Sequence, residues 1–433
     1  MSIRRTAICG LAVAVLGSLG LTACGSDDGG GEGGDVTLNF TWWGADERAS
    51  RYEEAIDLFE AAHPNIKVQT SFAEFNDYWT QRSTDATGQS LPDVFQMDLS
   101  YIQEYGNNGL LYDMGEYAGQ QLDTSTIDEQ LLDAGTVNDQ QVGIPLSTNT
   151  WALLINPDLL DELGVEAPDW DYTWDEFNDF LAEVAAAGAD HDPQVYGGGD
   201  YTMVWWTFMQ YLVQEGIEPF AENGQWNFTE QDLIDFLSLT EDLRFDGMVP
   251  AERVDQLDPA SVFGSGESPA DMTWDNFITN WGTELGSENV ELMPPPTGSD
   301  GEKHMFFKPS MLLSMGANTE HPEEAAQLVD FLVNDTEAGQ ILGTDLGVPA
   351  SQERLDALEV EEGSYDEKVI EYEARVRDEG YVTEPVPTPA QGFGAVEGEY
   401  VTVLADEFSY QQIDAEEFAS RLFDSLETNI VVQ

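Results

Sequence analysis

The chain has 433 residues, of which 84 are Asp or Glu and 15 are Lys or Arg, and its formal net charge is −69. Because one hydrophobic core rarely extends beyond about 250–300 residues, this length predicts two lobes. The charge argues against binding to nucleic acid or to anionic lipid through basic patches, and four His and two Cys argue against a metal site.

Residues 1–23 are predicted to be a secretory signal peptide. Arg4 and Arg5 precede an apolar run at 7–21, which is shorter than the roughly 20 residues of a membrane-spanning helix. The LTAC sequence that ends at Cys24 resembles the bacterial lipoprotein box, in which cleavage precedes a Cys whose thiol receives lipid. The alternative is an ordinary signal peptide followed by a coincidental Cys.

A flexible tether is predicted over residues 24–35. The sequence GSDDGGGEGGD after Cys24 has no apolar residue, so it cannot pack, and a Gly-rich stretch of this length spans roughly 17–20 Å. Acyl chains on Cys24 would hold the body near a membrane, outside the cytoplasm. Cys9 would leave with the signal peptide, so we expect no disulfide in the mature chain.

The acidic residues are spread along the body rather than gathered in one loop. This pattern favours a solvated surface adapted to high salt, where screening removes the repulsion between like charges. The alternative is an acidic patch that binds cations. No compact Asp-x-Asn-x-Asp-Gly loop occurs, which favours the surface interpretation.

Strands and helices are predicted to alternate in the first part of the body. Apolar and polar residues alternate from Val36 to Trp42, which predicts a strand that ends at Gly44. The following predicted elements are a helix over 47–62, a strand over 66–72, a helix over 75–87, a strand within 92–98 and a helix over 101–108. This alternation predicts α/β layers around a largely parallel sheet.

The rest of the body is predicted to continue in the same class. Thr173 and Glu176 form a capping box that opens a helix reaching residue 187, and Asp414 and Glu417 form a second box. The other predicted elements are extended pieces at 142–145 and 152–155, a strand over 311–315, and helices over 229–245, 322–333 and 414–426.

Several tryptophans fall where extended segments end, beside small or polar residues: Trp43, Trp151, Trp205 with Trp206, and Trp274. In open α/β sheets, ligands bind beyond the carboxyl ends of the strands. An indole face against the C–H face of a sugar ring, with Asp, Asn or Glu accepting from hydroxyls, is the chemistry expected of sugar binding. The alternative is that the rings fill the core, as we expect of Trp79, Trp170 and Trp174.

Charged residues near these positions are the candidate polar contacts. Asp46, Asp98 and Asp275 could accept from hydroxyls, although an acid in so acidic a chain is more often solvated surface. Arg48 is more informative because basic residues are scarce. Its guanidinium either donates hydrogen bonds to a ligand oxygen, or the residue simply begins a helix. Lys308 leaves a similar choice open.

No catalytic constellation is marked out by the sequence. It contains no Gly-x-Ser-x-Gly, no phosphate-cradling Gly loop and no His-Glu-x-x-His. A glycosidase needs two placed carboxylates, and no pair stands out among the 84 acidic residues. We therefore expect no enzymatic activity, no cofactor and no metal.

A series of short segments runs through the chain: TWWG at 41–44, FEAAHPNIKV at 59–68, PDVFQMD at 92–98, GIP at 143–145, LINPD at 154–158, TWDEF at 173–177, MTW at 272–274, HPEEAAQLVDFLVND at 321–335 and GVPAS at 347–351. In this order, over 36–433 and behind a lipoprotein signal, they resemble the extracytoplasmic solute-binding proteins of carbohydrate ABC importers. That family includes the maltose-binding proteins. Each segment is weak alone, but the series is specific.

The resemblance implies a two-lobe periplasmic-binding-protein fold. In this clamshell, each lobe is a mostly parallel sheet flanked by helices, and further helices follow at the C-terminus. The implied lobes are 36–146 with 312–348, and 147–311 with 349–433. The chain would cross between them near Ser147–Asn149 and again near Pro309–Leu312.

The resemblance also implies where ligand contacts fall. In this chain the corresponding residues are Trp43, Arg48, Asp98, Asn149 and Trp274, followed by Trp205, Lys308 and Phe393. Together with Asp275 as a hydroxyl acceptor, these residues form the predicted ligand-binding set. The exceptional acidity departs from the family pattern, and it affects the surface rather than the site.

The implied function is that of a substrate-binding receptor of an ABC-type sugar importer. We expect a monomer that captures a sugar between two hinged lobes and delivers it to permease subunits in the membrane. The alternatives are a secreted polysaccharide-active hydrolase and a surface lipoprotein with no small ligand. The many aromatic residues favour an oligosaccharide, and Arg48 and Lys308 leave an acidic sugar open as the ligand.

Overall fold

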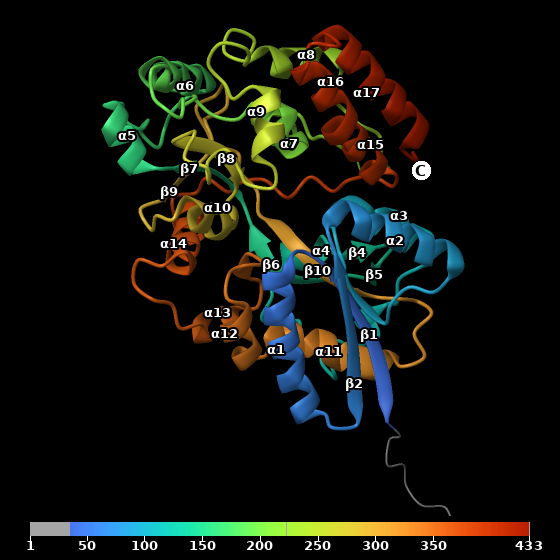
Figure 1. Cartoon of the computed structure of the whole chain (residues 1–433). Helices are drawn as coiled ribbons and strands as arrows, with labels where there is room; N and C mark the ends of the chain where they lie inside the picture. Colours follow the sequence, from blue (N-terminus) through green and yellow to red (C-terminus); the bar gives the residue numbers. More distant parts are fainter. Residues whose placement is uncertain (1–34, 222, 433) are drawn as a thin grey trace, which may run out of the picture. The chain divides into compact units, whose positions relative to one another are not determined.

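A computed structural model describes residues 35–221 and 223–432 (Figure 1). The predicted signal peptide, 1–23, lies outside the described residues, and so do Cys24 and the rest of the predicted tether as far as residue 34. Within the described ranges, no helix combines the length and the apolar character that crossing a membrane requires.

The larger sheet has six strands in the order β11-β6-β10-β3-β1-β2. They are β1 (Val36–Trp43), β2 (Ile66–Ala73), β3 (Val94–Met97), β6 (Ile144–Asn149), β10 (Lys308–Met315) and β11 (Val348–Pro349). β1 pairs in parallel with β2 and β3, whereas β10 and β11 run antiparallel to the strands beside them. The predicted α/β class is confirmed, but a mostly parallel sheet is wrong. The sheet is mixed, because β1, β2, β3 and β6 run in one direction whereas β10 and β11 run in the opposite direction, so three of its five pairings are antiparallel.

The smaller sheet has three strands in the order β8-β7-β9, and both of its pairings are antiparallel. They are β7 (Trp151–Ile155), β8 (Ala270–Trp274) and β9 (Glu291–Met293). The chain passes from β8 to β9 through α10 (Phe277–Leu285). β7 lies between these two strands and runs antiparallel to both, so the predicted parallel pairing is wrong here too. Thr150 alone separates β6 from β7, so one extended run of chain feeds both sheets.

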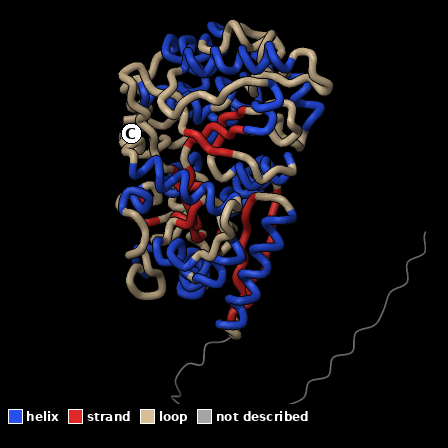
Figure 2. The backbone as a smooth tube through the Cα atoms, turned by 90° about the vertical axis from the view of Figure 1, so that its left-hand side faces the viewer, coloured by secondary structure: helices blue, strands red, loops and turns tan. Residues whose placement is uncertain are grey.

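Helices and loops lie on both sides of the strands (Figure 2). The other helices are α1 (Asp46–Ala62), α2 (Phe75–Gly88), α3 (Leu99–Asn107), α4 (Glu129–Asp133), α5 (Pro157–Leu163), α6 (Trp174–Gly188), α7 (Trp205–Gln214), α8 (Glu230–Ser238), α9 (Ala251–Leu257), α11 (Pro322–Asn334), α12 (Thr336–Leu342), α13 (Gln352–Ala357), α14 (Tyr365–Asp378), α15 (Phe393–Glu399), α16 (Ala405–Ser409) and α17 (Ala415–Asn429). Short helical turns are η1 (Met114–Tyr117), η2 (Tyr201–Met203) and η3 (Tyr400–Leu404), and a small ribbon joins β4 (Thr136–Val137) to β5 (Gln140–Gln141).

Most predicted helices are confirmed with small changes at their ends, and the capping box of Thr173 and Glu176 opens α6. The helix predicted over 229–245 is too long, because α8 ends at Ser238 and turns follow. The side chain of Arg244 explains the early end. It folds back and donates to the Leu237 carbonyl and the Thr240 hydroxyl, so it satisfies a carbonyl at the helix end in place of a further helical turn.

An aromatic core fixes the first strand to the first helix. Phe40 and Trp42 of β1 are fully buried, and so is Tyr52 of α1. The ring centroids of Trp42 and Tyr52 lie 4.7 Å apart, and those of Phe40 and Trp42 lie 5.0 Å apart. Rings packed in this way contribute more than their buried area alone. The core therefore gives the ends of the neighbouring strands defined positions, and those ends carry polar residues.

Candidate functional site

Three of the predicted ligand residues meet where strands of the larger sheet end. Asp98 follows β3 and caps α3, with its Oδ1 accepting from the Ser100 N–H at 2.8 Å. Lys308 begins β10 and lies in register with Asn149, the last residue of β6. The Lys308 Nζ is 3.5 Å from the Asp98 Oδ2. Both side chains are nearly buried, so the sheet holds this ion pair largely away from water.

Two tryptophans enclose the Lys308 ammonium group. It lies 5.4 Å from the ring centroid of Trp206, on α7, and 5.5 Å from that of Trp274, at the end of β8. An ammonium over indole faces is attracted by the ring quadrupole, most strongly where water is excluded. Lys308 thus connects the larger sheet to two aromatic side chains that pack with the smaller one.

A carboxyl group from α15 completes the cluster. Glu397 accepts a hydrogen bond from the Trp206 Nε1–H at 2.9 Å. Burial and the charge of Asp98 raise the pKa of Glu397 to about 7, while a hydrogen bond from Ser100, the charge of Lys308 and the Trp206 contact act in the opposite direction. Near neutral pH this carboxyl can therefore either donate or accept.

A cavity of about 820 Å³ lies beside Trp274. Its aromatic wall includes Trp151, Trp274, Phe277 and Trp281, and the Trp151 and Trp274 rings meet edge to face with centroids 4.5 Å apart. Its polar wall includes Asp200, Arg244 and Asp271. Burial raises the pKa of Asp271 to about 7. Aromatic faces and a few polar groups therefore line one space, as binding cavities for small molecules require.

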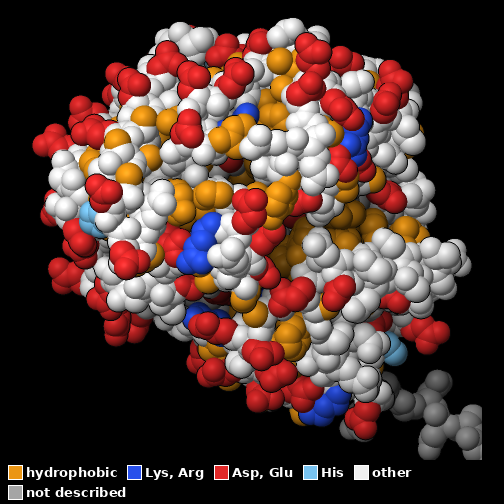
Figure 3. All heavy atoms as spheres, turned by 45° about the horizontal axis from the view of Figure 1, so that its top comes forward, with side chains coloured by type: hydrophobic (Ala, Val, Ile, Leu, Met, Phe, Trp, Pro, Cys, Tyr) orange, Lys and Arg blue, Asp and Glu red, His pale blue; other side chains and the backbone are white. Residues whose placement is uncertain are grey.

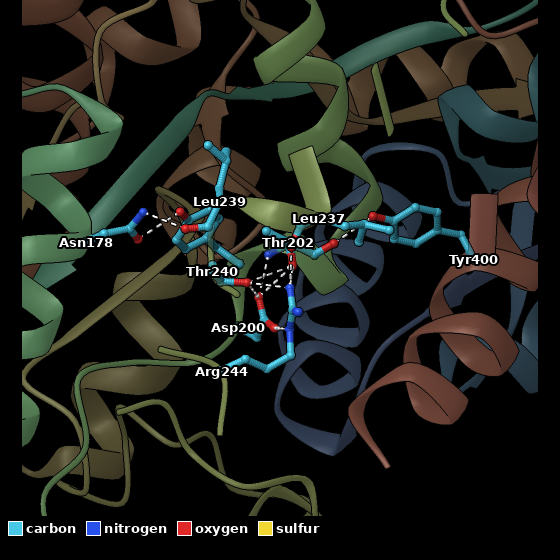
Figure 4. Close-up of polar contacts among 9 residues, drawn as sticks. Asn178, Asp200, Thr202, Leu237, Leu239, Thr240, Arg244 and Tyr400 are labelled. Carbon is cyan, nitrogen blue, oxygen red and sulfur yellow. Dashed lines mark hydrogen bonds and ion pairs between the residues drawn. The ribbon is translucent and has the colours of Figure 1, made fainter. Parts of the chain in front are cut away.

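The polar wall of this cavity is fixed by a hydrogen-bond network (Figure 4). The Arg244 Nε lies 2.6 Å from the Asp200 Oδ2, and the same guanidinium donates to the Thr240 hydroxyl at 2.6 Å. Asp200 also accepts from the Thr202 hydroxyl at 2.6 Å, and the Tyr400 hydroxyl donates to the Thr202 carbonyl at 2.6 Å. Figure 4 shows Asp200, Thr202 and Thr240 around Arg244, and Tyr400 joins the network through Thr202. The Nε and Nη2 of Arg244 donate to groups of the protein, which fixes the position of the guanidinium in the wall.

The surface around such hollows is strongly acidic. On the face drawn in Figure 3, apolar side chains are exposed inside hollows, and Asp and Glu side chains crowd the ridges around them. Lys and Arg are few on this face. Any ligand that enters therefore passes through a negative field.

Trp43 and Arg48, predicted as ligand contacts, have partners within the larger-sheet half. The Trp43 ring is 9% exposed and meets the Phe75 and Tyr78 rings, each with centroids 5.5 Å away. Arg48 pairs with Asp345 at 3.1 Å and donates to the Trp43 carbonyl at 3.1 Å. Gly44 has a φ of +145°, and a Cβ there would lie 2.8 Å from the Arg48 side chain, so only glycine fits. Neither Trp43 nor Arg48 lines the cavity beside Trp274.

Three other predicted contacts are buried. Trp205 and Phe393 are 1% and 0% exposed, and they face each other with ring centroids 5.4 Å apart in the core. Asp275 is 0% exposed, and its Oδ2 accepts from the Thr150 N–H at 3.2 Å. The structure therefore offers a ligand no open face of these residues, and their role in binding stays a prediction.

The predicted ligand-binding set left out Trp206, Glu397 and Asp271, although Trp206 was named beside Trp205 among the tryptophans that could stack on a sugar. Trp205 and Trp206 are adjacent on α7, so their side chains point about 100° apart, and the sequence alone did not indicate which one faces the polar cluster. Glu397 lies one helical turn after Phe393, so the predicted Phe393 turn was a signal that pointed near it. Asp271 lay unmarked among many acids. Within 35–221 and 223–432, no group of three or more His, Cys, Asp or Glu could hold a metal ion.

Comparisons with known proteins agree with this architecture. A lactose-binding protein from Rhizobium radiobacter is 25% identical over 205 residues, which cover 46% of this chain and 44% of that protein. The match thus spans less than half of the length of that relative.

Two solved structures extend the comparison. An extracellular solute-binding protein family 1 member from Alicyclobacillus acidocaldarius is 27% identical with a TM-score of 0.65, over 92% of this chain and 99% of that one. A periplasmic oligogalacturonide-binding protein from Yersinia enterocolitica, in complex with saturated digalacturonic acid, is 23% identical with a TM-score of 0.77, over 91% and 98%. Residues 44–339, well over half of the chain, match the family described as bacterial extracellular solute-binding protein. The chain belongs to that family.

Proposed function

We propose that this protein is the substrate-binding receptor of an ABC-type sugar importer, with a sugar or oligosaccharide as its ligand. The observation that carries the proposal is the cavity of about 820 Å³, which is lined by the aromatic residues Trp274, Trp151 and Phe277 together with the polar residues Asp200, Arg244 and Asp271. A sugar ring has an apolar C–H face and a rim of hydroxyls, so it matches aromatic faces and polar groups at once. The name of the lactose-binding relative supports the same chemistry.

The lobes form the moving parts of the proposed receptor. We assign 36–146 with 312–348 to one lobe and 147–311 with 349–433 to the other. A ligand that contacts both lobes shifts an open–closed equilibrium by its differential affinity for the closed form. The described lining of the cavity belongs to 147–311 and 349–433, so the other lobe would have to close over it. Asp98 of that lobe pairs with Lys308, which lies beside the Trp274 ring, and this contact supports a site next to the boundary between the lobes. The closed form would then dock on membrane permease subunits.

The place of action is inferred from the family and the predicted leader. The members of the matching family are extracellular solute-binding proteins, which supports a location outside the cytoplasm. The lipid anchor at Cys24 is part of the proposal, and so is a monomeric receptor that touches the membrane only through that anchor.

A calorimetric titration of the mature chain against a panel of sugars tests the proposal. The panel holds lactose, maltotriose, a galacturonate disaccharide and free monosaccharides. We expect at least one to bind without being cleaved, and to raise the free energy of unfolding by about 2.7 kcal/mol at a hundredfold excess over its dissociation constant. Binding by none of these sugars, with no thermal shift, would contradict the proposal.

The same samples separate the receptor from a hydrolase. A polysaccharide-active enzyme would release shorter sugars, and it would lose its rate when one carboxylate becomes an amide, as in Asp271→Asn. A receptor releases no product and changes only its affinity. Chromatography of the sugars after incubation distinguishes the two.

A further inference from the structure

Two buried carboxyl groups meet behind the candidate site. Asp275, which directly follows Trp274, is 0% exposed, and Glu373 of α14 is 1% exposed. One short stretch of chain brings the two carboxyl groups together, because Glu373 accepts from the Thr148 hydroxyl and Asp275 accepts from the Thr150 N–H. Each of the two acids also influences the pKa of the other. Because two carboxylates can only accept, a direct hydrogen bond between them requires a proton.

The other contacts of the pair show where that proton sits. The Asp275 Oδ2 accepts from the Thr150 N–H at 3.2 Å, whereas the Asp275 Oδ1 has no donor among the described residues. Both Glu373 oxygens accept from the Thr148 hydroxyl, at 3.1 and 2.8 Å. Glu373 is thus supplied with a donor, and Asp275 has one oxygen left over. The two Glu373 oxygens share one hydroxyl proton, so a proton on the Asp275 Oδ1, donated to Glu373, would give the Asp275 Oδ1 a partner and Glu373 a second donor.

The pair connects the segments that carry two predicted ligand residues. Thr148 and Thr150 flank Asn149 in the run of chain that passes from β6 to β7. Asp275 lies between Trp274 and Asn276, and Asn276 accepts from the Asn149 side chain at 3.4 Å. The Asp275 N–H also donates to the Thr150 carbonyl at 3.1 Å. Main-chain and side-chain contacts of Asp275 therefore join the two segments at Thr150, and Glu373 holds Thr148 on the other side of Asn149.

We infer that Asp275 keeps a proton at neutral pH and donates it to Glu373, and that this buried hydrogen bond positions the segments of Asn149 and Trp274. Asp275 and Glu373 are then positioning residues rather than ligand contacts. Their effect on sugar binding rests on the function proposed above, but the protonation and the positioning do not.

The charges around the pair agree with a retained proton. Burial, followed by the charge of Glu373, raises the pKa of Asp275 well above its usual range, and burial raises the pKa of Glu373 to about 7. Arg377, one turn along α14, opposes the shift of Glu373, and Tyr372 lies beside both acids. Glu373 also borders a cavity of about 770 Å³, whose other charged groups are Asp128, which caps α4, Asp133 at the end of α4, Arg377 and Glu384. These acids outnumber Arg377, so the cavity does not favour a second negative charge.

The first test follows unfolding by urea at one salt concentration, from pH 5 to pH 8. The folded wild type holds a proton that the unfolded chain releases. As the pH rises, the folding equilibrium constant of the wild type should therefore fall, relative to that of Asp275→Asn, by up to about tenfold for each pH unit. The control is Glu371→Gln, which removes an exposed acid from the same helix and should parallel the wild type. Parallel curves for the wild type and Asp275→Asn would overturn the inference.

The second test measures amide hydrogen exchange in the segment 148–152. In Asp275→Asn, the amide oxygen still accepts from Thr150 and the amide N–H₂ donates to Glu373, so exchange should match the wild type. In Asp275→Ala both contacts are lost, and we expect exchange at Thr150 to be at least tenfold faster, even where the variant stays folded. Wild-type protection in Asp275→Ala, or fast exchange in Asp275→Asn, would overturn the positioning role.

Titrations with lactose and maltotriose connect the pair to the site. A sugar that binds the wild type should bind Asp275→Asn within about twofold and Asp275→Ala at least tenfold more weakly. Equal affinity of Asp275→Ala and the wild type would overturn the role of the pair at the site. If neither sugar binds the wild type, the proposed function is in question, while the unfolding and exchange measurements still decide the protonation and the positioning.

Discussion

Two groups of aromatic side chains, one around Trp43 and one around Trp274, lie at the ends of strands in different sheets. Trp43 ends the buried stretch of β1 and is enclosed by Phe75, Tyr78 and Trp79. Trp274 ends β8, remains partly exposed, and lines a cavity of about 820 Å³. The same residue type at equivalent ends of strands thus stabilises one half and faces open space in the other.

The helices after each strand account for the difference. In the larger sheet, α2 brings further rings over Trp43, and Arg48 of α1 closes the turn after β1 by pairing with Asp345. After β8, the short α10 leaves Phe277 exposed beside Trp274, and Lys308 lies against the Trp274 ring. An aromatic ring can bind a ligand only where its neighbours leave a face free, so the group around Trp274 is the better candidate.

The replacement Trp43→Ala would sharpen this comparison most. A buried aromatic ring truncated to Ala leaves a cavity, so we expect a loss of about 3–5 kcal/mol in the free energy of unfolding. Chemical denaturation measures this loss. Sugar affinity at a temperature where the variant stays folded should change by less than threefold, and a large loss of affinity with intact stability would place Trp43 at the ligand instead.

The replacement Trp274→Ala should show the opposite pattern. Removing a ring that stacks on the sugar weakens binding by about 10- to 100-fold, or roughly 1.4–2.8 kcal/mol. The melting temperature should fall much less than in Trp43→Ala, because the ring is partly exposed. Calorimetry with the best sugar of the panel measures the affinity. Trp281→Phe, on the same wall, serves as a conservative control that keeps an aromatic face.

The Glu397→Gln variant tests whether the polar cluster titrates as its surroundings indicate. Because the pKa of Glu397 is raised to about 7, the folded chain holds a proton that the unfolded chain releases above pH 4.5. The stability from this group is therefore complete at low pH and falls as the pH rises towards 7. We expect the wild type to lose about 1–2 kcal/mol relative to Glu397→Gln between pH 5 and 7, reduced from the full linkage value because the side chain is partly exposed. The free energy of unfolding is measured by chemical denaturation at several pH values, and the same dependence on pH in both proteins would contradict this.

The replacement Thr173→Ala calibrates the comparison with a change remote from both aromatic groups. It removes the cap and the reciprocal contact with Glu176 at the start of α6, which should cost about 1 kcal/mol of stability. Thr229→Ala at the matching box of α8 should behave alike. Sugar affinity should be unchanged in both, as measured by calorimetry, and a change would show that binding responds to general stability.

Local sequence patterns predicted much of the fold. The alternation from Val36 to Trp42 located β1 because a strand with one buried face fixes its register. The box at Thr173 marked α6 because its hydrogen bonds are local. The direction of strand pairing was not predictable in this way. β10 pairs with β3 and β6, which lie far away in the sequence, and nothing within β10 indicates its direction.

The candidate site could be predicted only in part, for a similar reason. Asp98, Asn149 and Lys308 lie at strand ends, and the structure brings them together. Burial separates the others. Trp205 and Trp206 are neighbours in the sequence, but only Trp206 reaches Glu397 and Lys308, while Trp205 packs against Phe208, Phe393 and Tyr400. That choice depends on helices far along the chain, which a single segment does not encode.

A crystal structure of the mature chain with a sugar from the panel tests the central claim most directly. We predict a pyranose ring with its C–H face on the Trp274 indole, inside the cavity bounded by Trp151 and Phe277, and with hydroxyls within reach of Asp200 or Asp271. A sugar bound elsewhere on the protein, with the Trp274 cavity empty, would contradict the account.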